Sequence, residues 1–259
     1  MTTILSFIPL LVIVAIIVLI VRKISNKSLS TNSSEQPVRL FFQYALILGL
    51  FITFNVGLAG LLGKIIGTSS DVVADQSSLA SNLAFVVVSG PLLAWLLLWL
   101  KKSIARNPLD AAGFIPTFFA TLAAIISLLV FLSSAIAVSY NLIEGAPTLG
   151  YTSARAIVWG LALILVLRAS NAVIPKNDFR IQYFVGSLIT AIAAIVGLTK
   201  VLADLFSTIL SQPIFLGAQA PALISTGEKL LDGFGTLVIA SALWFYYWIK
   251  NANTKTNDT

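Results

Sequence analysis

The chain of 259 residues contains no cysteine and no histidine. The lack of cysteine excludes disulfides, thiolate catalysis, iron–sulfur clusters and thiolate zinc sites. The lack of histidine removes the usual ligands of haem, zinc and copper, and the side chain that most often carries protons near neutral pH. We therefore expect neither a cofactor nor a metal site in this protein.

Charged residues are scarce as well, at 10 % of the chain, whereas a soluble domain carries about 25 %. Hydrophobic residues make up 58 % of the chain, and the mean hydropathy is +0.97. The apolar residues come in blocks of about 20, which at about 1.5 Å per residue are long enough to cross about 30 Å of hydrocarbon. The sequence therefore predicts an all-α integral membrane protein.

Seven such blocks follow one another along the chain. The first, at 4–21, is followed by Arg22 and Lys23, whereas a secretory signal peptide has its positive charge before the apolar stretch, so we interpret the block as an uncleaved span. The other six spans are expected at 40–66, 81–100, 114–140, 152–174, 181–205 and 230–249. The predicted organisation is an N-terminal span at 1–24, a cytoplasmic polar linker at 25–38, a six-span membrane domain at 39–250 and a disordered cytoplasmic tail at 251–259.

Basic residues gather on one side of these spans. Counting Arg168 at the nearest helix end, 12 of the 16 lie in or beside the linker, the turns 101–110 and 175–180, and the tail. By the positive-inside rule these segments are cytoplasmic, which places the N-terminus outside and the C-terminus inside the cell membrane. The basic residues behind the net charge of +6 thus serve to orient the protein in the membrane. We therefore expect no nucleic-acid partner.

Aromatic residues crowd the expected cytoplasmic ends of two spans: Trp95 and Trp99 precede Lys101, and Trp244, Tyr246, Tyr247 and Trp248 precede Lys250. Such rings prefer the headgroup level of a bilayer, so we expect them at the lipid interface. The two sets share the same Trp-to-Lys spacing, and a second sequence echo links 43–58 with 182–198. We infer a seven-helix bundle with one leading span and three parallel two-helix units.

The run LAFVVVSGPLLAWLLLWLKKSIARNP from Leu83 lies between the 39–66 block and the span that contains Trp159-Gly160. This arrangement resembles an uncharacterised bacterial family of multi-pass membrane proteins, one of the domain-of-unknown-function families. The resemblance covers roughly 39–250 and leaves the first span outside. It implies a membrane fold with repeated two-helix units, and it carries no catalytic residues that can be transferred to this chain.

Ionisable residues inside a membrane are the default functional candidates, because burying an unpaired charge is costly. Arg155 and Arg168 lie 13 residues apart, about 20 Å along a helix, which is shorter than the hydrocarbon thickness. The favoured interpretation is two anchors whose long side chains reach toward water at either end of a short or tilted span. The alternative is a buried ion pair of Arg155 with Asp204 or Asp232.

Two further polar positions allow an ordinary and a functional interpretation. Asp232 precedes Gly233 at the start of the last span, where it either complements the helix dipole, which we favour, or faces a cavity. Asn55 lies in mid-span beside Ala59 and Gly63. Small residues at this spacing let helices approach closely, and the amide is then expected to find a partner across the interface.

These spans supply no converging nucleophile, base or phosphate loop, so we expect no enzyme activity. Microbial rhodopsins need a lysine deep in the last span, but here Lys229 and Lys250 lie only at its ends. The favoured function is a structural or accessory membrane protein whose partners are lipid, itself or other membrane proteins. The alternative is a small-solute or ion transporter or channel with a cavity between the helices. The apolar outer segment 207–226, with Pro213 and Pro221, is expected to form a re-entrant piece or a surface lid.

Overall fold

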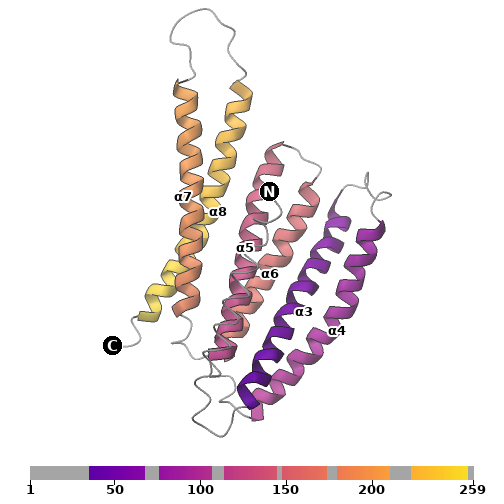
Figure 1. The fold of residues 1–259 in the computed structure, drawn as a ribbon. Helices are drawn as coiled ribbons and strands as arrows, with labels where there is room; N and C mark the ends of the chain where they lie inside the picture. Colours follow the sequence, from indigo (N-terminus) through magenta and orange to yellow (C-terminus); the bar gives the residue numbers. More distant parts are fainter. Residues whose placement is uncertain are drawn as a thin grey trace, which may run out of the picture. The chain divides into compact units, whose positions relative to one another are not determined.

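The computed structural model describes residues 35–67, 76–106, 114–144, 148–173, 180–210 and 223–255. These residues contain helices and no strand, which confirms the all-α prediction (Figure 1). The helices are α3 (Glu35–Ile66), α4 (Gln76–Arg106), α5 (Phe114–Glu144), α6 (Leu149–Val173), α7 (Arg180–Leu210) and α8 (Leu223–Lys255). The predicted first span at 1–24 and most of the linker lie outside the described residues.

Each of the six later spans corresponds to one helix, but most of the helices are longer than the apolar blocks. Helix α3 begins at Glu35, inside the predicted linker, and α8 continues to Lys255, inside the predicted tail. A helix of about 31 residues is about 46 Å long, whereas the hydrocarbon is about 30 Å thick. The helices therefore extend beyond the apolar blocks, and polar residues continue them without an apolar signal in the sequence.

The predicted outer segment 207–226 belongs in part to its neighbouring helices. Helix α7 ends at Leu210, shortly before Pro213, and α8 begins at Leu223, shortly after Pro221. The two prolines thus lie in the interval between the helices, as expected from the missing N–H and the restricted backbone of proline. Residues 211–222 lie outside the described part of the chain.

Five of the helices are long and apolar enough to cross a membrane: Arg39–Ile66, Ser78–Ala105, Phe114–Leu142, Leu149–Ser170 and Gln182–Phe206. These helices carry large exposed apolar side chains, among them Leu98, Leu165 and Ile195. A soluble protein cannot leave such surface in contact with water, whereas a bilayer solvates it. The chain is therefore a membrane protein. Helix α8 is not among the five, and its side chains from Leu223 to Asp232 lie outside the described part of the chain.

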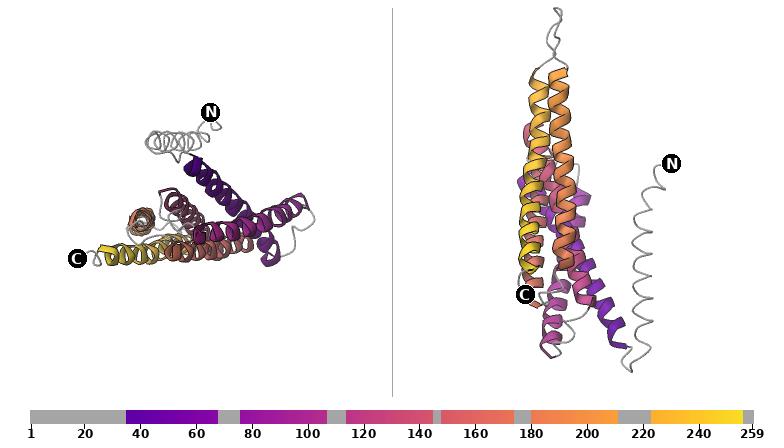
Figure 2. Two further views of the ribbon diagram at one scale, coloured as in Figure 1. Left: turned by 90° about the horizontal axis from the view of Figure 1, so that it is seen from below. Right: turned by 90° about the vertical axis from the view of Figure 1, so that its left-hand side faces the viewer.

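The chain divides after Leu46 into two compact units, and the contacts described below lie within the second unit, 47–259. In this unit α7 and α8 pack side by side, and α5 packs against α6 and α8 (Figures 1 and 2). One cluster of buried side chains draws on all four of these helices: Ala124, Leu128, Leu163, Leu167, Tyr183 and Tyr247. Helices α5 to α8 thus share a core.

Glycines mark the closest contacts between helices. A Cβ atom added to Gly197 of α7 would lie 2.7 Å from the backbone nitrogen of Leu237 in α8. On α3, a Cβ atom at Gly63 would lie 3.0 Å from the ring of Tyr151 in α6. The second contact confirms the prediction that the small residues after Asn55 permit close approach of another helix.

Candidate functional site

Asn55 lies in the middle of α3, and its side chain is 5 % exposed. Its Nδ2 donates a hydrogen bond to the carbonyl oxygen of Phe51, one turn earlier on the same helix, at 2.7 Å. The expected amide partner across a helix interface is therefore not what the structure shows. A short polar side chain in a helix can bond to the i−4 carbonyl, and this local solution satisfies the donor.

The two arginines of α6 lie at different depths. Arg155 is half-buried and Arg168 is exposed near the end of the helix. Neither guanidinium has a hydrogen bond or an ion pair with any side chain in the described segments, so Arg155 is not joined to Asp204 there. Asp204 is half-buried near the end of α7, and Asp232 falls within α8 at a position whose side chain lies outside the description. The other four predicted polar positions lie on three different helices: Asn55 on α3, Arg155 and Arg168 on α6, and Asp204 on α7.

Tyr247 of α8 is the largest fully buried side chain among the described residues, with 1 % of its surface exposed. Its ring lies against Gly186 of α7, where an added Cβ would be 2.5 Å from Cε1, and its centroid is 6.3 Å from that of Tyr183. Tyr247 therefore packs between helices and is not among the rings that can face lipid. Its neighbours Tyr246 and Trp248 are exposed, as the predicted place at the lipid interface requires.

A buried stripe on α8 gives the signal that sequence reasoning missed. Thr236, Ala240 and Tyr247 are all buried, and their spacing of four and seven residues places them on one helix face. The stripe begins with small residues and ends with the tyrosine. Small residues let α7 approach α8, and Gly186 then leaves room for the tyrosine ring.

Several buried polar atoms have no hydrogen-bond partner within the described part of the chain: Ser127 Oγ, Gln182 Nε2 and Oε1, Thr236 Oγ1 and Tyr247 Oη. They come from α5, α7 and α8. An unsatisfied polar group in an apolar medium costs about 2–7 kcal/mol, depending on the reference state. These atoms are therefore positions where a water molecule or a ligand atom would be stabilising. In the sequence, Gln182 was singled out only as part of an internal echo.

Other interior polar groups are satisfied by nearby backbone or by a neighbouring helix. Thr190 Oγ1 donates to the carbonyl oxygen of Gly186 at 2.8 Å, and Ser134 Oγ donates to that of Val130 at 2.6 Å. Between helices, Asn141 Nδ2 of α5 donates to Thr152 Oγ1 of α6 at 3.0 Å. These side chains are uncharged at neutral pH. The first two bonds lie within one helix, and the Asn141–Thr152 bond joins α5 to α6.

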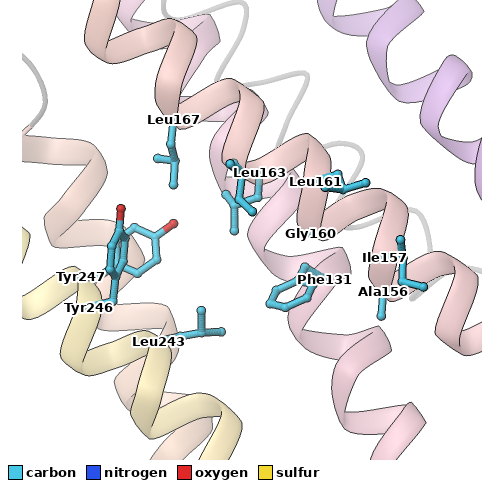
Figure 3. Close-up of a pocket in the computed structure, with 11 residues that line it drawn as sticks. Phe131, Ala156, Ile157, Gly160, Leu161, Leu163, Leu167, Leu243, Tyr246 and Tyr247 are labelled. Carbon is cyan, nitrogen blue, oxygen red and sulfur yellow. The ribbon is translucent and has the colours of Figure 1, made fainter.

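A hollow of about 550 Å³ lies between α5, α6 and α8 (Figure 3). Phe131 of α5 and Gly160 lie on one side of the hollow, and Leu243, Tyr246 and Tyr247 of α8 lie on the other. The remaining lining residues belong to α6: Ala156, Ile157, Leu161, Leu163, Ile164 and Leu167. Because the side chains of Ile157, Leu161 and Ile164 are exposed, the hollow opens sideways, toward the hydrocarbon of a membrane.

Residues 39–169 match the family model described as a domain of unknown function, DUF5671. The match covers just over half of the chain, runs through α3, α4 and α5, and ends near the end of α6. It is shorter than the resemblance over 39–250 that the sequence suggested. Comparison with curated proteins and comparison with solved structures found no match.

Proposed function

Because the chain belongs to the DUF5671 family, whose domain has no known function, we propose a role from the physical character of its helices. The protein is a structural or accessory membrane protein that acts through lipid or protein partners and does not turn over a substrate of its own. The observation that carries this proposal is the scatter of its ionisable side chains over different helices and depths.

Coupled transport and catalysis inside a bilayer depend on ionisable groups that are held at depth by partners. Of the described positions, Arg155 is half-buried within a candidate span, while Arg168 and Asp204 lie close to the ends of theirs. Long cationic side chains near helix ends reach the headgroup layer at low cost. Interior positions are mainly hydroxyl and amide groups, several of which bond to carbonyl groups of their own helix. This pattern favours packing over permeation.

The proposed architecture is a bundle of seven spans in a bacterial cytoplasmic membrane, with the N-terminus outside and the C-terminus inside. Helix α8 is then a span whose exposed Trp244, Tyr246 and Trp248 lie at the headgroup level before Lys250. The first span at 1–24 completes the count of seven.

The six later spans form three parallel two-helix units under this proposal. Support comes from glycines in two helix pairs. A Cβ at Gly57 of α3 would lie 2.8 Å from Phe85 of α4, and one at Gly197 of α7 would lie 2.7 Å from Leu237 of α8. Both glycines belong to the Val-Gly-Leu echo, and each contacts the helix that follows it. The spacing of Trp95 and Trp99 on α4 recurs on α8.

Topology can be tested directly because the chain has no cysteine. Single cysteines on the proposed outer side should react with an impermeant maleimide in intact cells, at Ser70, Thr148 and Gln212. Single cysteines on the proposed cytoplasmic side should react only after the cells are opened, at Ser30, Asn107 and Asn253. Reversed labelling would contradict the orientation.

The accessory role can be tested with purified protein in liposomes. We expect no flux of ions or small solutes above that of empty vesicles, and affinity capture from the native membrane should recover another copy or another membrane protein. A specific flux that is lost in Asp232→Asn or Arg168→Gln would overturn the proposal. A matched control is Lys101→Gln, since Lys101 is an exposed cation on another helix.

Transport through a cavity between the helices is the second candidate, and one observation favours it. Gln182, Ser127, Thr236 and Tyr247 are buried polar side chains without a partner in the described segments. A water-filled path through α5, α7 and α8 would satisfy them. Flux that falls in Gln182→Leu, but not in a lipid-facing control such as Leu188→Ala, would favour transport.

A further inference from the structure

The hollow between α5, α6 and α8 is long and lined almost entirely by apolar side chains, and its two ends differ in polarity. Along α6 its lining runs from Ala156 to Leu167, 11 residues apart, which is about 16 Å at about 1.5 Å per residue. One leaflet of a bilayer contributes about 15 Å of hydrocarbon, half of the total of about 30 Å. The hollow is therefore long enough to hold much of one acyl chain.

Polar groups gather at one end of this hollow. In Figure 3 both tyrosine rings carry their hydroxyl oxygens toward the Leu167 end, while Ile157 and Ala156 mark the other end. Tyr246 and Tyr247 are the lining residues that carry polar side-chain atoms. An occupant with a polar group at the Leu167 end and an apolar body toward Ala156 would match this distribution.

Two cations extend the lining at the same end. Arg168 follows Ile164 by four residues and Leu161 by seven, so the three share one face of α6. Lys250 follows Tyr246 by four residues, and its Nζ lies 5.9 Å from the centroid of the Tyr246 ring. Both cations are exposed, and the Ala156 end of the lining has Arg155 as its sequence neighbour on a different face of the helix.

We propose that this hollow binds one acyl chain of an anionic phospholipid from the leaflet on the Arg168 and Lys250 side. The acyl chain lies along α6 from Leu167 toward Ala156, and the phosphate lies at the level of the two cations. The hydroxyl group of the exposed Tyr246 is placed to donate to an ester or phosphate oxygen. This inference rests on the proposed membrane function and names the lipid partner class.

A helix from a second copy fits the hollow less well. A helix is about 10–12 Å wide with a pitch of about 5.4 Å, so about 550 Å³ corresponds to roughly one turn. An acyl chain is thinner and flexible, and in a bilayer acyl chains would surround the sideways opening at Leu161, which is 56 % exposed. The two cations also complement a phosphate, whereas the apolar helices of this chain offer few anions.

The test uses the full chain in phosphatidylcholine vesicles that contain a small fraction of a photoactivatable lipid. The probe is phosphatidylglycerol with a diazirine in one acyl chain, and the matched probe is phosphatidylcholine with the same chain. After irradiation, labelled peptides are mapped by mass spectrometry. We expect labelling to concentrate on 156–167 and 243–247, at several times the level on the lipid-facing residues Leu188 and Ile192 of α7.

Two variants separate the acyl-chain contact from the headgroup contact. Ala156→Phe fills the apolar end and should remove the concentrated labelling, whereas Ala94→Phe on the exposed face of α4 should not. Arg168→Gln should lower labelling by phosphatidylglycerol about fivefold, the contribution of one basic residue near an anionic surface. Arg168→Gln should leave labelling by phosphatidylcholine unchanged, and Lys101→Gln should change neither. Because the Arg168 side chain is exposed, we expect the Arg168→Gln variant to fold as the unsubstituted protein does.

Three results would overturn the site. Labelling spread evenly over all lipid-facing helices would show that the lipid is ordinary boundary lipid. Equal labelling by both probes would show that the two cations do not recognise an anionic headgroup. Crosslinks between two copies, formed in a separate experiment by a photoactivatable amino acid placed within 156–167, would replace lipid by a second chain. The liposome flux assay remains independent of these results, because solute flux would overturn the accessory role without changing where the lipid is labelled.

Discussion

The contact between α7 and α8 depends on two glycines, and replacing each by alanine tests the packing of the membrane domain. At Gly186 the new Cβ would lie 2.5 Å from the Cε1 atom of Tyr247, and at Gly197 it would lie 2.7 Å from the backbone nitrogen of Leu237. Gly49 of α3 is an internal control, because an added Cβ there meets nothing within 4 Å. The three sites differ in what must move.

The expected magnitudes follow from that difference. Alanine is more favourable than glycine in a helix by about 1 kcal/mol, so Gly49→Ala should raise the free energy of unfolding by up to about that amount. Overpacking costs about 1–3 kcal/mol. At Gly186 the obstacle is a side-chain ring that can shift slightly, so we expect a net loss of about 1 kcal/mol. At Gly197 the obstacle is backbone, which forces the two helices apart, so we expect a net loss of about 2 kcal/mol.

The measurement is the unfolding of the purified protein in mixed micelles by increasing sodium dodecyl sulfate, followed by circular dichroism. A double-mutant cycle adds a second check. Tyr247→Leu shortens the side chain that meets the new Cβ, so Gly186→Ala combined with Tyr247→Leu should cost less than the sum of the two single variants. The same partner substitution should not rescue Gly197→Ala.

The reasoning fails if the three alanine variants shift the transition equally, or if Gly197→Ala is as stable as Gly49→Ala. Either outcome means that α7 and α8 are not in the close contact that these distances require. If only Gly186→Ala lowers the free energy of unfolding, the contact between Gly186 and Tyr247 is supported and the backbone contact between Gly197 and Leu237 is refuted.

Three further predictions concern buried polar groups and charges. Tyr247→Phe should leave stability unchanged or raise it by up to about 1 kcal/mol in the same unfolding assay if the hydroxyl is unsatisfied, whereas a loss of about 1–2 kcal/mol would reveal a bound water or polar partner. Asn141→Ala should cost about 0.6–1.7 kcal/mol and should show coupling of that order with Thr152→Val, because the two side chains share an interhelical hydrogen bond. Arg155→Gln and Asp232→Asn should have small and additive effects; a single variant that costs more than the double variant would instead establish a buried ion pair.

The sequence was sufficient to locate the described helices because their apolar blocks are long and well separated. It was less informative at helix ends, since polar residues such as Gln76 and Lys255 continue a helix without adding hydropathy. Composition cannot distinguish a loop from such an extension. Proline was the more reliable boundary signal, because α8 begins soon after Pro221 and α7 ends shortly before Pro213.

The interior of the domain was harder to predict because one residue type has several stable environments in a membrane. A tyrosine near the end of a helix can remain exposed, as Tyr246 does, or fill a space opposite a glycine, as Tyr247 does. The decision depends on Gly186 of another helix, which no local pattern reveals. The side-chain amide of Asn55 similarly donates to a carbonyl oxygen of its own helix and not to a group on another helix.

The close glycine contacts and the open hollow have a common physical origin. Between helices in a bilayer there is little hydrophobic driving force, because lipid tails are as apolar as leucine side chains. Helices therefore associate where glycine lets backbones and rings approach closely, as at Gly186 and Gly197. At the hollow between α5, α6 and α8 nothing drives the space to collapse, because a lipid chain solvates it as well as protein does. A lipid-filled hollow beside a tightly packed α7–α8 pair is thus the expected result, and filling the hollow with Ala156→Phe should change lipid labelling with little effect on the unfolding transition.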